Sequence, residues 1–216
     1  MLEKMAEFFE ARLNMYDEHM LNDIEGADLF YPFTAECLPK ENGAYVLDLG
    51  CGTGLELQEY FRLNPTAKIT GIDLSEGMLN ALKEKFKDKE ISLIQGSYFD
   101  VPFGENKFHA AVSVESLHHF TKKAKIPLYK KLYGSLKEGG YFILTDYFAP
   151  DDDYEKFYQN ELVRLKKEQG IADSEFYHYD TPLTVKHETE ALLEAGFASV
   201  EILHSWENTY TIKAVK

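Results

Sequence analysis

The run VLDLGCGTG, residues 46–54, constrains the fold of this chain more than any other segment. It joins a short apolar stretch, typical of a buried strand, to residues 55–63, which have the apolar spacing of a helix. Glycines alternate at positions 50, 52 and 54, where a tight turn needs unusual dihedral angles and the backbone can approach a ligand closely. The run therefore predicts a strand–loop–helix unit that binds a ligand at its glycine loop.

The alternation of strands and helices continues along the chain. Further strands are expected at 68–72, 91–95, 108–114, 141–147, 200–204 and 209–215, and helices at 76–86, 121–136, 151–169 and 184–195. Gly139 and Gly140 are expected to end the helix that begins at Thr121. This order predicts an α/β fold, a parallel sheet with helices on both faces. Only a short turn near Glu207 separates the last two strands, so the terminal strand should be antiparallel.

Two carboxylates indicate the kind of ligand. Asp73 follows Gly54 by nineteen residues, at the end of the second strand, where a carboxylate can accept hydrogen bonds from both hydroxyls of a ribose. Asp48 is expected at the mouth of the site, where it would disfavour a pyrophosphate and favour a ligand with ammonium or sulfonium charge. Alternatively, Asp48 bonds the glycine-loop amides, and both roles can hold at once. The glycine spacing and Asp48 count against an NAD-dependent oxidoreductase.

Charge and composition exclude other classes. The chain has 23 Lys plus Arg and 37 Asp plus Glu, a formal net charge of −14, which argues against nucleic acid or an anionic membrane as partner. No apolar run of roughly 18 residues is present, so no membrane span is expected. The 2 cysteines cannot form a disulfide framework, and the N-terminus lacks a secretory signal, so we expect a cytoplasmic protein.

Four motifs together resemble the class I S-adenosylmethionine-dependent methyltransferases. They are VLDLGCGTG (46–54), GIDLSEGM (71–78), VSVESLHHF (112–120) and LKEGGYFILTDYF (136–148), and residues 181–203 are similar to the end of many small-molecule members. The resemblance implies a Rossmann-like doubly wound sheet of seven strands with the last strand antiparallel. It also implies a helical N-terminal lid, S-adenosylmethionine as cofactor, S-adenosylhomocysteine as product and a small-molecule acceptor.

The resemblance also divides the chain and assigns residues to the cofactor. One domain, 1–216, would comprise a helical N-terminal cap (1–43), a cofactor-binding core (44–148), and substrate-side helices with the C-terminal hairpin (149–216). The implied cofactor-binding residues are Asp48, Gly50, Cys51, Gly52 and Gly54 of the first motif, Asp73 for the ribose, Leu74 and Met78 for the adenine, Ser97 and Tyr98 in the turn after the third strand, and Glu115 at the methionine end. Where many members have an acidic residue in that turn, this chain has Ser97; its hydroxyl, a backbone group or Asp100 would then bind the adenine amino group.

His118, His119 and Tyr16 are the candidate catalytic residues. Either histidine can accept a proton from an acceptor; alternatively, one caps the next helix and the other packs under the lid. Tyr16 is expected to contact the methionine carboxylate or the substrate, or else to pack against the sheet edge. No metal is expected, because no His-Glu-x-x-His motif occurs and His187 and Glu188 are interpreted as solvated surface.

The favoured function is methyl transfer to a small molecule by in-line displacement. The alternative is an S-adenosylmethionine-binding protein that modifies the cofactor itself or has a regulatory role without methyl transfer. The sequence leaves the acceptor unnamed, and a homodimer is left open.

Overall fold

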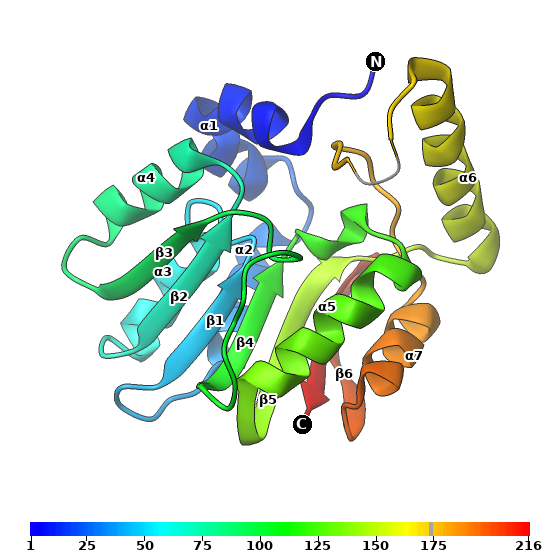
Figure 1. The fold of residues 1–216 in the computed structure, drawn as a ribbon. Helices are drawn as coiled ribbons and strands as arrows, with labels where there is room; N and C mark the ends of the chain where they lie inside the picture. Colours follow the sequence, from blue (N-terminus) through cyan, green and yellow to red (C-terminus); the bar gives the residue numbers. More distant parts are fainter. Residues whose placement is uncertain (173–174) are drawn as a thin grey trace.

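A single seven-stranded sheet organises the computed structural model, which describes residues 1–172 and 175–216. The sheet has the order β3-β2-β1-β4-β5-β7-β6 (Figure 1). The strands are β1 (Tyr45–Leu49), β2 (Lys68–Asp73), β3 (Glu90–Gln95), β4 (Phe108–Val114), β5 (Leu136–Tyr147), β6 (Ser199–Trp206) and β7 (Thr209–Val215). All neighbouring pairs are parallel except those of β7, which is antiparallel to both β5 and β6. The predicted doubly wound sheet with an antiparallel last strand is confirmed.

Helices cover both faces of this sheet (Figure 1). The helices are α1 (Met5–Asn22), α2 (Ala27–Glu36), α3 (Leu55–Leu63), α4 (Glu76–Lys85), α5 (Lys122–Ser135), α6 (Asp152–Gln169) and α7 (Val185–Ala195), with a short 3₁₀ turn, η1 (Leu117–His119). Alternate residues of each central strand face opposite cores: Val46 packs with α2, α3 and α4, whereas Leu47 packs with α5 and α7. Within the described ranges no helix has the length and apolarity needed to cross a membrane.

The direction of the chain changes between β1 and β4. From β1 it runs outward through β2 to β3 and then returns to β4 on the other side of β1. Loops at the carboxyl ends of these two strands therefore diverge, which leaves a crevice where ligands bind in sheets of this kind.

The first helix is fastened over this crevice by its own acidic side chains. Glu10 accepts hydrogen bonds from Ser75 Oγ at 2.6 Å and from Gly77 N at 3.0 Å, at the N-terminus of α4. Asp17 accepts a hydrogen bond from Thr53 Oγ1 in the glycine loop and pairs with Lys85 Nζ at 2.8 Å. Part of the acidity of the first forty residues thus positions α1 over the carboxyl ends of the strands.

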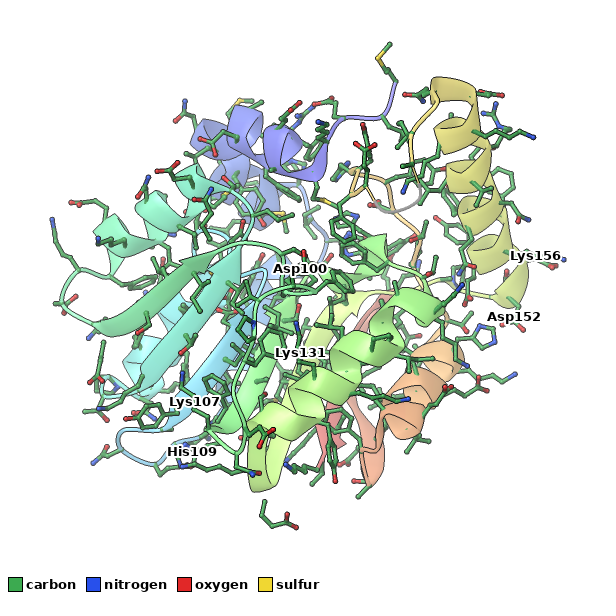
Figure 2. All side chains as sticks on the ribbon, in the orientation of Figure 1. Asp100, Lys107, His109, Lys131, Asp152 and Lys156 are labelled. Atoms are coloured by element: carbon green, nitrogen blue, oxygen red, sulfur yellow. The ribbon has the colours of Figure 1, made fainter. Side chains whose placement is uncertain are left out.

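The loop after β3 is fixed from α5. Lys131 Nζ donates to the carbonyl oxygens of Tyr98, Phe99 and Val101 at 2.6 to 2.8 Å, beside Asp100 (Figure 2). One ammonium group therefore satisfies three backbone carbonyls that have no partner in the sheet, and it fixes the position of the Tyr98 backbone.

Two details differ from the sequence-based expectation. The helix before β5 ends at Ser135, and β5 begins at Leu136, before the two glycines that were expected to end that helix. Gly139, with φ of 71°, lies within β5, and the pairing of β5 with β4 is irregular between Phe108 and Ala110. These glycines accommodate an irregularity in the strand instead of stopping the helix.

The interpretation of His187 and Glu188 as solvated surface is wrong. Glu188 is fully buried between α5 and α7, where it binds Lys125 Nζ at 2.5 Å and accepts a hydrogen bond from Tyr129 OH. His187 Nδ1 lies 2.8 Å from Glu155 Oε2. The helical spacing was correct, but the polar partner lies on another helix, so the sequence pattern alone resembled an exposed face.

We expect Lys125→Met to lower the free energy of unfolding by about 3–5 kcal/mol, because it leaves the buried Glu188 charge without its partner. Urea denaturation measures this loss. The double variant Lys125→Met/Glu188→Leu should recover most of it, since both charges are then removed.

The matched control is Lys122→Met, because Lys122 pairs with Glu190 at 2.6 Å between the same two helices but in contact with solvent. This variant should unfold close to the wild-type midpoint. Equal losses for Lys122→Met and Lys125→Met would contradict a special role for the buried pair.

Candidate active site

The glycine loop after β1 is packed directly against the loop after β4. Gly50, Gly52 and Gly54 have φ of 73°, 47° and 75°, which a residue with a Cβ rarely adopts. A Cβ on Gly50 would lie 2.1 Å from Ser116 Oγ, so no larger residue fits there. The two loops therefore touch at Gly50 and Ser116, and each borders the same crevice.

Asp73 closes the glycine loop from the end of β2. Its Oδ2 accepts a hydrogen bond from Gly52 N and its Oδ1 one from Ser75 N, both at 2.9 Å. Burial raises the pKa of Asp73, and these N–H donors oppose that shift. Each carboxylate oxygen retains a further lone pair that can accept from a ligand hydroxyl.

A small cavity of about 50 Å³ lies between this loop and α1. Its lining includes seven of the residues predicted to bind a cofactor, namely Gly50, Gly52, Asp73, Leu74, Met78, Tyr98 and Glu115. The other lining residues are Met5, Phe9, Tyr16, Ser116, His119 and Phe120. Among these residues of the described chain are two carboxylates and no lysine or arginine, so the cavity suits a cationic ligand and not a pyrophosphate.

Four predicted cofactor residues, Asp48, Cys51, Gly54 and Ser97, do not line this cavity. Cys51 turns its sulfur toward Gly71, and the Cα of Gly54 faces Leu82 and Phe86. Ser97 Oγ accepts a hydrogen bond from Phe99 N at 3.2 Å within its own turn. Their side chains therefore shape the loops, and direct cofactor contacts of these residues remain predictions.

The expectation that Asp48 stands at the mouth of the site is wrong. Its side chain is 1% exposed and lies against the buried carboxyl of Glu56 on α3, a contact that favours a proton on one of the two carboxyls. Burial, followed by the charge of Glu56, raises the pKa of Asp48 well above its usual range, and burial also raises the pKa of Glu56. Neither residue lines the small cavity.

A larger cavity of about 950 Å³ adjoins the small one. Both cavities share Phe9, Tyr16, Glu115 and His119 in their linings. The larger cavity reaches from α1 to the turn between β6 and β7, and its lining is rich in carboxylates, with Glu18, Asp23, Glu25, Glu115, Asp180 and Glu207 against Arg12. All three predicted catalytic residues, Tyr16, His118 and His119, line it.

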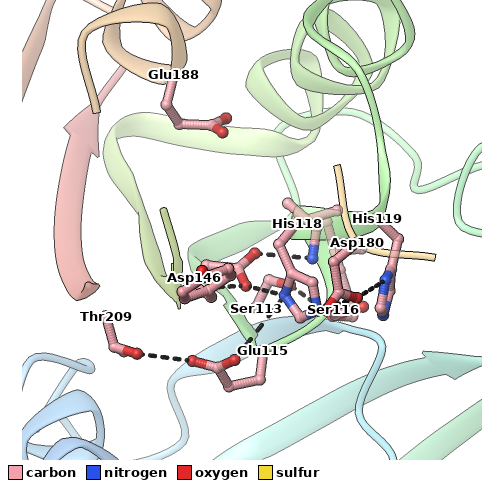
Figure 3. Close-up of polar contacts among 12 residues, drawn as sticks. Ser113, Glu115, Ser116, His118, His119, Asp146, Asp180, Glu188 and Thr209 are labelled. Atoms are coloured by element: carbon pink, nitrogen blue, oxygen red, sulfur yellow. Dashed lines mark hydrogen bonds and ion pairs between the residues drawn. The ribbon is translucent and has the colours of Figure 1, made fainter. Parts of the chain in front are cut away.

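Three buried residues, His118, His119 and Asp146, form a cluster with the partly exposed Asp180 on one side of this cavity (Figure 3). His118 Nδ1 lies 2.5 Å from Asp146 Oδ1, and its Nε2 lies 3.6 Å from Asp180 Oδ1. His119 Nδ1 lies 3.0 Å from the same Asp180 oxygen. Asp180 thus stands between the two imidazole rings, with Asp146 behind one of them.

The two histidines differ in protonation. Burial opposes the charged form of His118, but the Asp146 carboxylate outweighs it and raises the pKa of His118 to about 9. Burial and the nearby charge of His118 lower the pKa of His119 to about 4. Burial and the charge of Asp146 raise the pKa of Glu115, 3.9 Å from His118, to about 8.

Backbone hydrogen bonds hold this cluster in place. Asp146 accepts from Leu117 N at 2.8 Å and from Tyr147 N at 3.0 Å, and Thr181 N donates to His118 O at 2.9 Å. Asp146 was not among the predicted site residues, although it is the next-to-last residue of β5 and the carboxyl ends of parallel strands meet at this edge. Asp180 comes from an irregular segment after α6, and no sequence pattern pointed to it.

Comparison with known proteins places this arrangement in a family. A family model described as a methyltransferase domain matches residues 46–140. The chain is 32% identical over 241 residues to the carboxy-S-adenosyl-L-methionine synthase of Wolinella succinogenes, and the alignment covers 100% of this chain and 95% of that relative. This chain belongs to the class I S-adenosylmethionine-dependent methyltransferases.

Other members of the family support the assignment. The ubiquinone/menaquinone biosynthesis C-methyltransferase of Pseudomonas aeruginosa is 27% identical over 215 residues, covering 91% of this chain and 82% of that enzyme. The fold is also that of human N-acetylserotonin methyltransferase in complex with S-adenosylmethionine, with a TM-score of 0.68, 19% identity, and coverage of 96% and 56% of the two chains. The predicted enzyme class and the predicted cofactor, S-adenosylmethionine, are therefore confirmed at the level of the family.

The residues around the small cavity fit this cofactor. Asp73 offers carboxylate oxygens for the ribose hydroxyls, and Leu74, Met78 and Phe120 offer apolar surface for an adenine ring. Glu115 and Tyr16 line both cavities, and their oxygen atoms can form hydrogen bonds with a polar group of such a cofactor.

We expect Asp73→Ala to weaken binding of S-adenosylhomocysteine by roughly a hundredfold, since a hydrogen bond to a charged group contributes about 1.5–3 kcal/mol. Isothermal titration calorimetry measures the affinity. Asp88→Ala, which changes an exposed carboxylate after α4, should bind as the wild type does. An unchanged affinity for Asp73→Ala would remove the ribose assignment.

The Asp48–Glu56 pair predicts a pH-dependent stability. Both carboxyl pKa values are raised in the folded protein above the ordinary 3.8 and 4.5, so folding takes up a proton. The stabilisation is fully present below the unfolded values and is lost as the pH rises through the folded ones. Glu56→Gln, whose amide can donate to Asp48 without titrating, should reduce this decline in urea midpoint as the pH rises above the ordinary carboxyl range, about pH 5.

The control for this series is Glu59→Gln, on the same helix but at its surface, where the carboxylate pairs with Arg62. It should show the wild-type pH dependence. If Glu56→Gln loses stability with pH as steeply as Glu59→Gln does, the buried pair is not the source of the decline.

Proposed function

We propose that this chain transfers a methyl group from S-adenosylmethionine to a small-molecule acceptor bound in the larger cavity. The observation that carries the proposal is the contact between the two cavities, which share Tyr16, Glu115 and His119 in their linings. A cofactor against the glycine loop and an acceptor in the larger cavity would therefore meet beside these residues.

Methyl transfer requires mainly that the acceptor atom, the methyl group and the sulfur are aligned and that water is excluded. S-adenosylmethionine supplies an already activated methyl group, and the sulfonium leaves as a neutral thioether. The chain must hold the acceptor in line with the methyl group. Tyr16 and Phe9 of α1 cover this position from one side, and the His118–His119–Asp180 cluster faces it from the other. The cluster can orient a polar acceptor group and assist the loss of its proton.

The charges of the larger cavity narrow the class of acceptor. Its carboxylates outnumber its single arginine, and the whole chain carries a net charge of −14. A phosphorylated or otherwise polyanionic acceptor would meet repulsion there. A neutral or cationic small molecule with a nucleophilic oxygen, nitrogen, sulfur or carbon atom fits this lining best.

A second candidate is modification of the cofactor itself. The full-length match to a carboxy-S-adenosyl-L-methionine synthase favours it. Such a reaction places a new carboxylate next to the sulfur, on the side where Asp180 and the other carboxylates of the larger cavity contribute negative charge. This arrangement favours methyl transfer over carboxylation.

The test is incubation of the purified protein with methyl-labelled S-adenosylmethionine and a fractionated metabolite extract, followed by mass spectrometry. We expect S-adenosylhomocysteine to form only with particular fractions, together with one labelled product whose mass is increased by a methyl group. A heat-treated sample of the same protein controls for spontaneous decomposition of the cofactor.

Formation of a carboxylated cofactor, with no labelled acceptor, would establish the second candidate and overturn the first. Tight binding of S-adenosylmethionine without turnover in any fraction would instead favour a regulatory role.

A further inference from the structure

The His118–His119–Asp180 cluster contains two buried polar atoms whose closest polar neighbour is each other. His119 Nδ1 and Asp180 Oδ1 are inaccessible to solvent and lie 3.0 Å apart, and neither has a hydrogen bond to any other described residue. A cation bound by both atoms would use the lone pairs that this single contact leaves free.

The spacing of the cluster is close to that of a metal centre, and small side-chain movements would complete it. Bonds of about 2.0–2.2 Å to nitrogen and oxygen place neighbouring ligand atoms roughly 2.9–3.4 Å apart in octahedral or tetrahedral geometry. Asp180 Oδ1 lies 3.0 Å from His119 Nδ1 and 3.6 Å from His118 Nε2. All three potential ligand atoms lie within 4.8 Å of one another.

The surroundings of His118 also have the form of a metal site. A histidine ligand usually donates its second ring N–H to a carboxylate, which fixes the ring and its tautomer. His118 Nδ1 contacts Asp146 Oδ1 at 2.5 Å, and this leaves Nε2 directed at Asp180. Asp146 is itself held by the N–H groups of Leu117 and Tyr147.

We propose that His118 Nε2, His119 Nδ1 and the Asp180 carboxylate bind one divalent transition-metal ion, of which Zn²⁺ is the representative. Two imidazoles and one carboxylate suit Zn²⁺ or Fe²⁺, whereas Mg²⁺ prefers an all-oxygen set. The Asp180 side chain is 47% exposed, so the ion keeps positions open toward the larger cavity.

The proposed ion would lie where it could contact a bound acceptor. His119 lines both cavities, so the metal lies at their boundary. This role of the ion rests on the proposed function. An oxygen or nitrogen of the acceptor that binds the ion would lose its proton more readily and would point toward the methyl group. Metal binding itself does not depend on that function.

The experiment is a titration with Zn²⁺ by calorimetry, and with Co²⁺ by visible absorption, of protein purified without a histidine tag and treated with a chelator. No cofactor or acceptor is added, so failure of the proposed function cannot affect the result. We expect one ion per chain, no heat with Mg²⁺, and cobalt absorption bands typical of nitrogen ligation.

Three variants locate the site. His119→Ala and Asp180→Asn should each lower Zn²⁺ affinity at least tenfold, and Asp146→Asn, which acts through His118, should lower it by roughly 10–100-fold. His204→Ala, which changes an exposed histidine on β6, is the matched control and should bind as the wild type does. Circular dichroism checks that each variant is folded.

Asp180→Asn preserves the size of the side chain, so it decides the outcome if His119→Ala does not fold. The absence of a Zn²⁺ heat and of a cobalt spectrum in the wild type would overturn the proposal. Unchanged affinity in Asp180→Asn, with binding lost in His204→Ala, would place the metal at the surface and overturn it as well.

Discussion

The contact between the glycine loop and the end of β4 determines the rest of the site. Gly50 has no room for a Cβ because Ser116 lies against it. This close packing brings the loop that follows β1 next to the segment that carries Glu115, His118 and His119. The cofactor residues and the titratable cluster come from opposite sides of the switch point, and they can share one crevice only because these two loops touch.

The cluster itself depends on three separate parts of the chain. The histidines follow β4, Asp146 is the next-to-last residue of β5, and Asp180 lies in an irregular segment between α6 and α7. The sheet register fixes the first two, since Val114 pairs with Thr145. The third is brought in by the bond from Thr181 N to His118 O, and by the pairing of Lys4 with Tyr177 at the start of α1. The same segment thus connects the covering helix to the cluster.

The sequence predicted the fold well because the relevant signals are local. A segment of about ten residues is enough to recognise each apolar strand, the glycine loop and the short final hairpin. The structure contains all of these elements. Predictions for side chains were less successful where the partner is distant along the chain. Asp48 was expected to face the ligand but faces Glu56, and Glu188 was expected in solvent but binds Lys125. The residue pattern within one helix or strand indicates which face is apolar. It does not indicate which charged side chain from another element packs against that face.

The fastening of α1 has a consequence for the timing of turnover. The small cavity of about 50 Å³ has room for only one or two water molecules, far less than a nucleoside with an amino-acid side chain. A cofactor that fills this space would have to displace side chains of α1 such as Tyr16 and Phe9, and the bonds of Glu10 and Asp17 would oppose that movement. The hydrogen bonds that hold α1 in place would then also influence how fast one cofactor molecule is exchanged for the next.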